Sequence, residues 1–254
     1  MKHTIRYSVL FIMIIICAVC AVSCSDGEVK KEAGDAVQVP TADPKATVAV
    51  KDVMSDNKKT TLKGIDVSSY SGDIDWKSVK SDGIDFAMIR VGGRVYGESG
   101  ELYTDKKAVY NLTQARKNGI ETGAYFFSQA TSAKEAKEEA KQAVSSCAGR
   151  ILELPISCDV ERIKGDTSRI DNVSYADSVK FAKVFMKEIK KSGYEPMVYI
   201  GEDSILKAED FKGYKIWYAD YKKPYEKGYE ILQYSKTGKV KGINADVDLD
   251  IMYK

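Results

Sequence analysis

Short apolar runs with the length of strands recur from about residue 62 to the end of the chain, and polar, turn-forming segments separate them. Runs of about four to eight residues that are rich in β-branched and aromatic side chains are typical of buried strands. The pattern predicts strands at 63–67, 86–91, 122–128, 155–161, 196–200, 215–221, 230–234 and 247–252.

Amphipathic segments of helical length lie between the earlier strands. Near residue 185, Val179, Ala182, Phe185, Met186 and Ile189 recur at helical spacing. The predicted helices are 76–81, 105–118, 133–146 and 175–192, and a glycine lies just beyond three of them, where a left-handed cap is favoured. Eight strands with the helices confined to the first five units predict an irregular, barrel-like α/β fold.

Two polar segments of this region are given simpler interpretations. The run SAKEAKEEAKQA, residues 132–143, mixes charges at helical spacing and predicts an exposed, solvated helix face. The run GGRVYGESG, residues 92–100, is rich in glycine but matches neither the dinucleotide-binding nor the phosphate-loop pattern. We therefore expect a mobile loop there.

The amino-terminal segment has the pattern of an export signal. Lys2 and Arg6 precede an apolar run, residues 9–22, which is too short for a membrane span. The run ends in AVSC, which resembles the lipobox of bacterial lipoproteins and predicts lipidation at Cys24; an ordinary secretory signal is the alternative. We expect a signal peptide at 1–23 and an exported protein that is held at the membrane or cell surface by its lipid, or else secreted.

Residues 25–61 contain no aromatic side chain and show no period. Segments of this composition cannot bury enough apolar surface to fold. The domains are therefore predicted as a disordered tether at 24–61 and one folded domain at 62–254.

Charge and histidine content exclude several classes of function. Removal of residues 1–23 leaves 37 basic and 37 acidic residues, so the basic excess of a nucleic-acid-binding protein is absent. The single histidine, His3, is lost with the signal. The mature chain therefore has no Ser-His-Asp triad, no Cys-His dyad and no His-ligated zinc, and we expect neither a metal nor a cofactor.

Two cysteines remain after Cys24. Cys147 and Cys158 could form a disulfide in an oxidising compartment or pack as free thiols in the core. The sequence leaves both possibilities open.

Four acidic residues stand at the ends of predicted strands: Asp66, Asp159, Glu161 and Asp248. In a β/α barrel the functional groups lie at the carboxyl ends of the strands. The period of two places Asp159 and Glu161 on one face, about 6.6 Å apart along the strand, with the intervening side chains on the other face. Clustered carboxylates raise one another's pKa, which keeps a proton available for donation. The alternative is that these acids cap helices or pair with lysines.

Aromatic residues follow the same strands. Sugars stack the apolar faces of their rings on aromatic side chains and offer hydroxyl groups to carboxylates. The candidates for this role are Tyr125, Phe127, Tyr199, Trp217 and Tyr221. Acids and aromatics together favour a carbohydrate-active site.

The motifs, taken in order, resemble glycoside hydrolase family 25, the CH-type lysozymes. The resemblance covers residues 62–254 through KGIDVSSYSGDIDW, FAMIRVG, GAYFFSQA, CDVE, VYI, IWYADY, QYS and VDLD. It implies an irregular (β/α)5β3 TIM-like barrel that cleaves the β-1,4 bond between N-acetylmuramic acid and N-acetylglucosamine in peptidoglycan.

The resemblance also implies roles for the acids. Glu161 would be the catalytic acid and Asp159 its partner, with Asp66 and Asp248 beside them; Asp250 is close enough in sequence to replace Asp248 in this set. The five aromatic candidates would line the sugar subsites. The implied partner is the peptidoglycan glycan strand, bound by a monomer that contacts the membrane only through its lipid.

Two other classes of protein remain as alternatives. A non-catalytic glycan-binding barrel on the cell surface would keep the aromatics without needing all four acids. A chitinase-like hydrolase is disfavoured because its DxxDxDxE pattern is absent.

Overall fold

The computed structural model describes residues 61–222 and 229–253. The predicted signal peptide, the lipidation site at Cys24 and almost all of the predicted tether lie outside the described residues. Within the described ranges, no helix combines the length and the apolar character that a membrane crossing needs.

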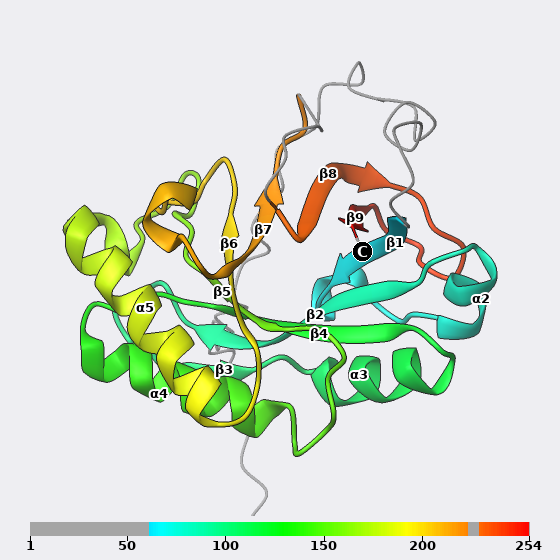
Figure 1. Cartoon of the computed structure of the whole chain (residues 1–254), viewed down its shortest axis with the longest axis horizontal. Coiled ribbons are helices and arrows are strands. Elements are labelled where there is room, and N and C mark those ends of the chain that lie inside the picture. Colours follow the sequence, from blue (N-terminus) through cyan, green and yellow to red (C-terminus); the bar gives the residue numbers. More distant parts are fainter. Residues whose placement is uncertain (1–60, 223–228, 254) are drawn as a thin grey trace, which may run out of the picture. The chain divides into compact units, whose positions relative to one another are not determined.

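Eight strands close into a barrel, as the sequence predicts (Figure 1). Neighbouring strands from the first to the seventh run parallel, and the last strand runs antiparallel to both of its neighbours. In order around the barrel they are β1 (Thr61–Val67), β2 (Phe86–Arg94), β4 (Glu121–Phe127), β5 (Ile156–Asp159), β6 (Pro196–Ile200), β7 (Lys215–Ala219), β8 (Ile231–Gly238) and β9 (Val247–Tyr253), which pairs with β1.

Four α-helices lie at the predicted places. They are α2 (Trp76–Ser81), α3 (Ala108–Lys117), α4 (Ala133–Ser146) and α5 (Tyr175–Lys191). The Asp75, Ser132 and Ser174 side chains cap α2, α4 and α5 by accepting hydrogen bonds from first-turn backbone N–H groups. Between β6 and β7 the chain forms only the 3-10 turn η3 (Ala208–Phe211), and the described residues after β7 are helix-free. This is the (β/α)5β3 pattern.

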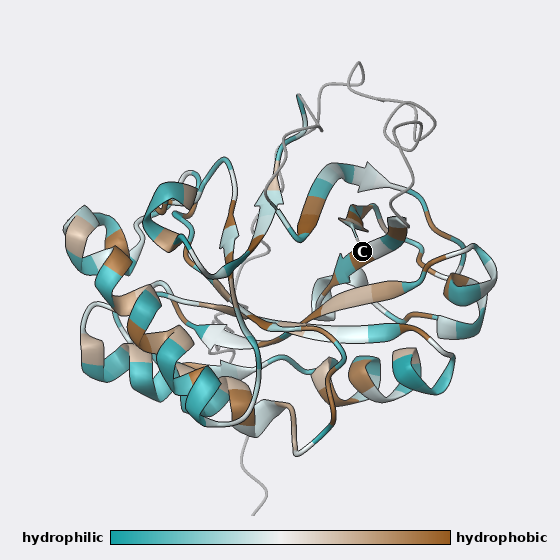
Figure 2. Ribbon diagram, in the orientation of Figure 1, coloured by the Kyte–Doolittle hydropathy of each residue, from teal (hydrophilic) through white to brown (hydrophobic). Residues whose placement is uncertain are grey.

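Alternation along the strands separates two hydrophobic cores. In β2, Phe86 and Met88 join a cluster with Met197, Trp217 and Ile231, and this cluster fills the barrel. The alternate residues Ala87, Ile89 and Val91 pack in the outer cluster between the barrel and the helices. In Figure 2 the helices accordingly carry hydrophobic residues along one side and hydrophilic residues along the other.

A hairpin replaces part of the mobile loop predicted at 92–100. Strand β2 continues to Arg94 and pairs antiparallel with β3 (Leu102–Thr104). Glycine is required at this crossing, because a Cβ on Gly92 would lie 2.3 Å from the main-chain oxygen of Tyr103. The glycines that suggested flexibility therefore permit close strand contact, and the prediction is wrong for residues 92–94.

The interpretation of residues 132–143 as a solvated helix face is also wrong in part. Glu139 of α4 is completely buried, and its carboxylate accepts hydrogen bonds from Arg94 Nε at 2.8 Å and from Ser128 Oγ at 2.5 Å. The charge pattern on α4 could not reveal this burial because the cationic partner comes from the β2–β3 hairpin.

The two remaining cysteines are both free and buried. Cys158 lies in the outer core, and burial raises the pKa of the Cys147 thiol to about 12. Of the two possibilities that the sequence leaves open, the structure has unpaired core thiols.

Candidate active site

One end of the barrel gathers all four predicted acids. Asp66 lies near the end of β1, directly opposite Asp248 in the β1–β9 ladder. Asp159 is the last residue of β5, and Glu161 follows two positions later. Burial raises the pKa of Glu161, and the charges of Asp159 and Asp248 add to the rise, so acids of different strands lie within electrostatic reach of one another.

Asp250 belongs to the same cluster. The sequence left open whether Asp248 or Asp250 is the last acid of the site, and the structure places both there. Asp250 is 1% exposed and accepts a hydrogen bond from Trp217 Nε1 at 2.8 Å. It pairs with Gly64 in the β1–β9 ladder, one layer deeper in the barrel than Asp248. Asp248 is half-buried and lies nearer the open end.

The three acids of β1 and β9 all have raised pKa values. Burial, followed by the charges of Asp248 and Asp250, raises the pKa of Asp66 well above its ordinary value, although a hydrogen bond from Gln233 Nε2 at 2.6 Å opposes the rise. Burial also raises the pKa of Asp250 well above its usual range and that of Asp248 to about 6. A hydrogen bond from Asp66 stabilises the ionised form of each β9 acid.

Asp159 and Glu161 form the second half of the cluster. Burial raises the pKa of Asp159 to about 7, against the attraction of Arg90. Desolvation raises the pKa of Glu161 well above its ordinary value, and the charge of Asp159 adds to it. Because Glu161 is also partly exposed, it is an acid with a raised pKa that a bound molecule can reach.

The predicted strand 155–161 is too long. β5 ends at Asp159, and Glu161 forms an isolated antiparallel bridge with Ser204. The alternation predicted for this segment nevertheless holds, because Cys158 and Val160 both pack in the outer core, away from the acids.

The aromatic candidates lie beside the acids but differ in exposure. Trp217 is 2% exposed and packs edge-on against Tyr199 and Tyr125, with ring centroids 4.8 and 5.6 Å away. Tyr125, Phe127 and Tyr221 are half-buried. Phe127 lies opposite Asp159 in the β4–β5 ladder. Ring surface for stacking is therefore available mainly on these three residues, and the buried Trp217 packs against Tyr125.

Comparison with known proteins places this arrangement in a family. The model of the family described as Glycosyl hydrolases family 25 matches residues 65–243. The chain belongs to this family.

Relatives of known name are consistent with that membership. The autolytic lysozyme of Clostridium acetobutylicum is 28% identical over 196 residues, which are 74% of this chain and 55% of the relative. The modular autolysin LytC of Streptococcus pneumoniae, solved in complex with a synthetic peptidoglycan ligand, is 27% identical, with a TM-score of 0.63 over 76% of this chain and 47% of LytC. A family 25 glycosyl hydrolase from Bacillus anthracis is 25% identical, with a TM-score of 0.62 over 76% of this chain and 89% of its own. The chain thus spans about half the length of the first two relatives.

Two residues of the family 25 site escaped the sequence analysis. Gln233, 4% exposed, donates to Asp66 and accepts hydrogen bonds from Tyr199 at 3.0 Å and Tyr221 at 2.6 Å. Arg90 donates to Asp105 through Nε and Nη2, at 3.0 and 2.9 Å. Alternation could have found both, since Arg90 follows Phe86 and Met88 on the inward face of β2 and Gln233 follows Ile231 on β8.

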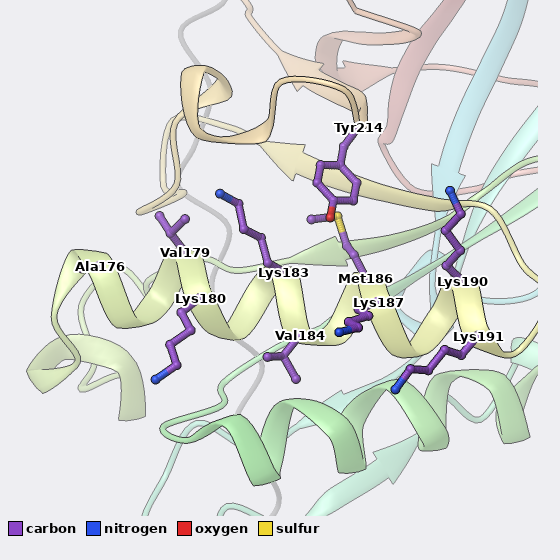
Figure 3. Close-up of a pocket in the computed structure, with 10 residues that line it drawn as sticks. All are labelled: Ala176, Val179, Lys180, Lys183, Val184, Met186, Lys187, Lys190, Lys191 and Tyr214. Atoms are coloured by element: carbon purple, nitrogen blue, oxygen red, sulfur yellow. The ribbon is translucent and has the colours of Figure 1, made fainter.

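A separate groove of about 710 Å³ lies on α5, away from these acids. Its lysines flank the helix, with Lys183 and Lys190 on the side of Tyr214 and Lys180, Lys187 and Lys191 on the other (Figure 3). None of the clustered acids lines it, so it is not part of the site. Among the described residues, no group of His, Cys, Asp and Glu side chains could hold a metal ion.

Proposed function

We propose that the family 25 domain hydrolyses the β-1,4 bond between N-acetylmuramic acid and N-acetylglucosamine in peptidoglycan. The observation that carries the proposal is the reachable Glu161 carboxyl, whose raised pKa keeps it protonated beside Asp159. The names of the relatives support the substrate, since one is an autolytic lysozyme and another was solved with a peptidoglycan ligand.

Glu161 acts as the general acid in this proposal. Its proton goes to the glycosidic oxygen as the bond to the anomeric carbon breaks, and the leaving sugar departs with a free hydroxyl group. A positioned acid of this kind contributes about 10²–10⁴-fold to the rate. Glu161, then ionised, takes a proton from the water molecule that completes the reaction.

Asp159 assists the substrate instead of attacking it. The oxygen of the sugar's own 2-acetamido group attacks the anomeric carbon, and the Asp159 carboxylate orients the acetamido N–H and stabilises the positive charge that develops. Water then opens the cyclic intermediate, so the product retains its anomeric configuration. Substrate assistance is a known exception to the two-carboxylate scheme.

The remaining acids and aromatics bind the glycan. Asp66 and Asp248 offer oxygens to sugar hydroxyls at the open end of the barrel, and Gln233 holds Asp66 in place. Tyr125, Phe127 and Tyr221 provide the stacking surfaces, and the buried Trp217 packs against Tyr125.

We also propose that the chain is an exported lipoprotein that acts as a monomer. The lipobox-like segment that ends at Cys24 supports this location. The lipid would be the only contact with the membrane, and the glycan strand the partner of the domain.

Identification of the cleaved bond tests the proposed function. Purified peptidoglycan would be digested, reduced with borohydride and analysed by mass spectrometry, with Glu161→Gln protein as the control. We expect new reducing ends on N-acetylmuramic acid in the wild-type digest alone. New ends on N-acetylglucosamine would contradict the assigned bond, and glycan binding without cleavage would favour the non-catalytic barrel.

The substrate-assisted route has its own test. Peptidoglycan from which the N-acetyl groups have been removed should still bind through the aromatics but should not be cleaved. NMR of the first-formed anomer from acetylated material should show retention. An inverted first product, or full cleavage of the de-N-acetylated polymer, would exclude this route while leaving the acid assignment intact.

A further inference from the structure

The residues that follow β4 form hydrogen bonds to the end of β5 and to the residues just after it, beyond the last residue pair of the β4–β5 ladder. Ser128 N donates to the main-chain oxygen of Asp159 at 2.7 Å. The next residue, Gln129, donates from Nε2 to the main-chain oxygen of Glu161 at 2.8 Å. Glu161 lies outside the β5 ladder, so its backbone is held from one side by this glutamine and from the other by the bridge to Ser204.

Gln129 is itself fixed on both sides of its backbone. Its N–H donates to Glu139 Oε1 at 3.2 Å, and its carbonyl accepts from Arg169 Nη1 at 2.9 Å. Arg169 is anchored by two hydrogen bonds to Glu135, at 3.1 and 2.9 Å. The Gln129 side chain is completely buried. The only freedom left to this residue is therefore its side-chain torsions, and the bond to Glu161 fixes those.

The acid that holds Gln129 is part of a buried ion pair. Glu139 is 0% and Arg94 5% exposed, and Arg94 also donates to the main-chain oxygen of Gly100 at 2.7 Å. A buried ion pair adds little net stability compared with apolar residues of the same volume, but it imposes one geometry. Arg94, Glu139 and Arg169 do not belong to the acid cluster. Through their hydrogen bonds they hold the backbone of Gln129, which in turn holds Glu161, so we assign them a positioning role.

We propose that Gln129 is the positioning residue of the general acid: it fixes the Glu161 carboxyl by holding the main-chain carbonyl of the same residue. The inference rests on the proposed role of Glu161. A carbonyl oxygen only accepts hydrogen bonds, so the task requires a donor at position 129. Because a misplacement of about 1 Å can cost about 10²-fold in rate, the loss of this hydrogen bond should slow the chemical step without changing how the glycan binds.

Two substitutions at position 129 separate positioning from simple packing. Gln129→Met keeps the length of the side chain and removes the donor; we expect kcat to fall about 10-fold or more with KM within about 2-fold. Gln129→Glu supplies a donor only when its carboxyl is protonated and repels the carbonyl when ionised. Its kcat relative to wild type should therefore rise as the pH falls. Gln114→Met, on α3, is the matched control and should change neither constant.

The pH comparison is made between proteins that share every other titrating neighbour. The charged groups that face position 129 are Glu139, Arg94, Arg169 and Glu135, and all are present in both proteins. Burial raises the pKa of Glu139 to about 7, so part of any change with pH in the ratio of Gln129→Glu to wild type comes from the coupling of Glu139 to the new carboxyl. If Gln129→Met fails to fold, this ratio still decides the matter: a ratio that approaches 1 where the new carboxyl is protonated supports the proposal, and a ratio well below 1 at every pH would overturn it.

A measurement independent of catalysis completes the test. The pKa of Glu161 would be followed by carbon NMR of its labelled carboxyl, with Glu161→Gln protein used to assign the signal. In Gln129→Met we expect this pKa to move toward the ordinary glutamate value, because the carboxyl gains contact with water. An unchanged titration and an unchanged kcat in Gln129→Met would overturn the positioning role. Wild-type protein that cleaves no peptidoglycan would instead defeat the proposed function, while the NMR result would still report on Gln129.

Discussion

The carboxyl groups clustered at one end of the barrel lower the stability of the folded protein when they are ionised. Five acids from β1, β5 and β9 and the residues after them lie close together, and burial raises the pKa of each one. The same burial that keeps Glu161 protonated therefore lowers stability at neutral pH. A functional site that weakens the fold in this way has a measurable dependence on pH.

Asp248 gives the sign of that dependence. Its pKa is about 6 in the folded protein and 3.8 in the unfolded chain, so the folded state binds the proton more tightly. The free energy of unfolding should fall as the pH rises from about 4 to 6, and Asp159, with a pKa of about 7, extends the window.

Asp248→Asn should remove part of this cost. We expect the variant to gain about 3 kcal/mol at pH 7 and almost nothing at pH 4, because the pKa of Asp248 rises from 3.8 to about 6 and each pKa unit corresponds to about 1.4 kcal/mol. Urea unfolding at several pH values measures this, with the exposed Asp166→Asn as the control. An Asp248→Asn variant that is less stable than wild type at pH 7 would contradict the account.

Sequence patterns located single residues better than they located their partners. The period of two placed Asp159 and Glu161 on the inward side, and the motif VDLD supplied both β9 acids. Alternation could have placed Gln233 on the inward face of β8, but its hydrogen bonds to Asp66, Tyr199 and Tyr221 could not be predicted, because those partners lie on three other parts of the barrel. Hydrogen bonds between distant strands exist only once the barrel has closed.

At the scale of elements, the strands and helices were predicted and the hairpin was not. Apolar periodicity marks an element that buries one face, which holds for every barrel strand and all four helices. Strand β3 is only three residues long and half-buried at best, so it carries no such pattern. Its place is set by the close approach of Gly92 to Tyr103.

Gly92→Ala tests that close approach. The new Cβ would lie 2.3 Å from a main-chain oxygen, so one strand of the hairpin must move. We expect a loss of about 2 kcal/mol or more in thermal or urea unfolding, the size associated with overpacking. Gly97→Ala is the matched control, since its Cβ would meet nothing within 4 Å. Equal stability of the two variants would show that the hairpin is not packed as described.

At the scale of the whole molecule, the closed barrel followed from the order of the elements. Eight predicted strands with helices only in the first five units allowed few other folds, and the closure of β9 onto β1 completes the barrel. The signal peptide, the lipidation site and the tether are predicted on a different basis, namely composition and a short motif.

Cys24→Ala tests the proposed anchor. In cells that process the signal, the wild-type protein should sediment with membranes and the variant should be released, because the lipid on Cys24 would be the only membrane attachment. Fractionation followed by immunoblotting measures this, with Cys147→Ala as a control that should remain membrane-bound. A mature Cys24→Ala protein that still sediments with membranes would contradict the lipoprotein assignment.

The turnover of Glu161→Gln on purified peptidoglycan tests the central claim most directly. Glutamine keeps the shape of the side chain and removes the proton that the glycosidic oxygen needs, so we expect turnover to fall by about 10²–10⁴-fold while glycan binding and the unfolding midpoint stay close to wild type. A variant that kept more than about a tenth of wild-type turnover would contradict the assignment of Glu161 as the general acid.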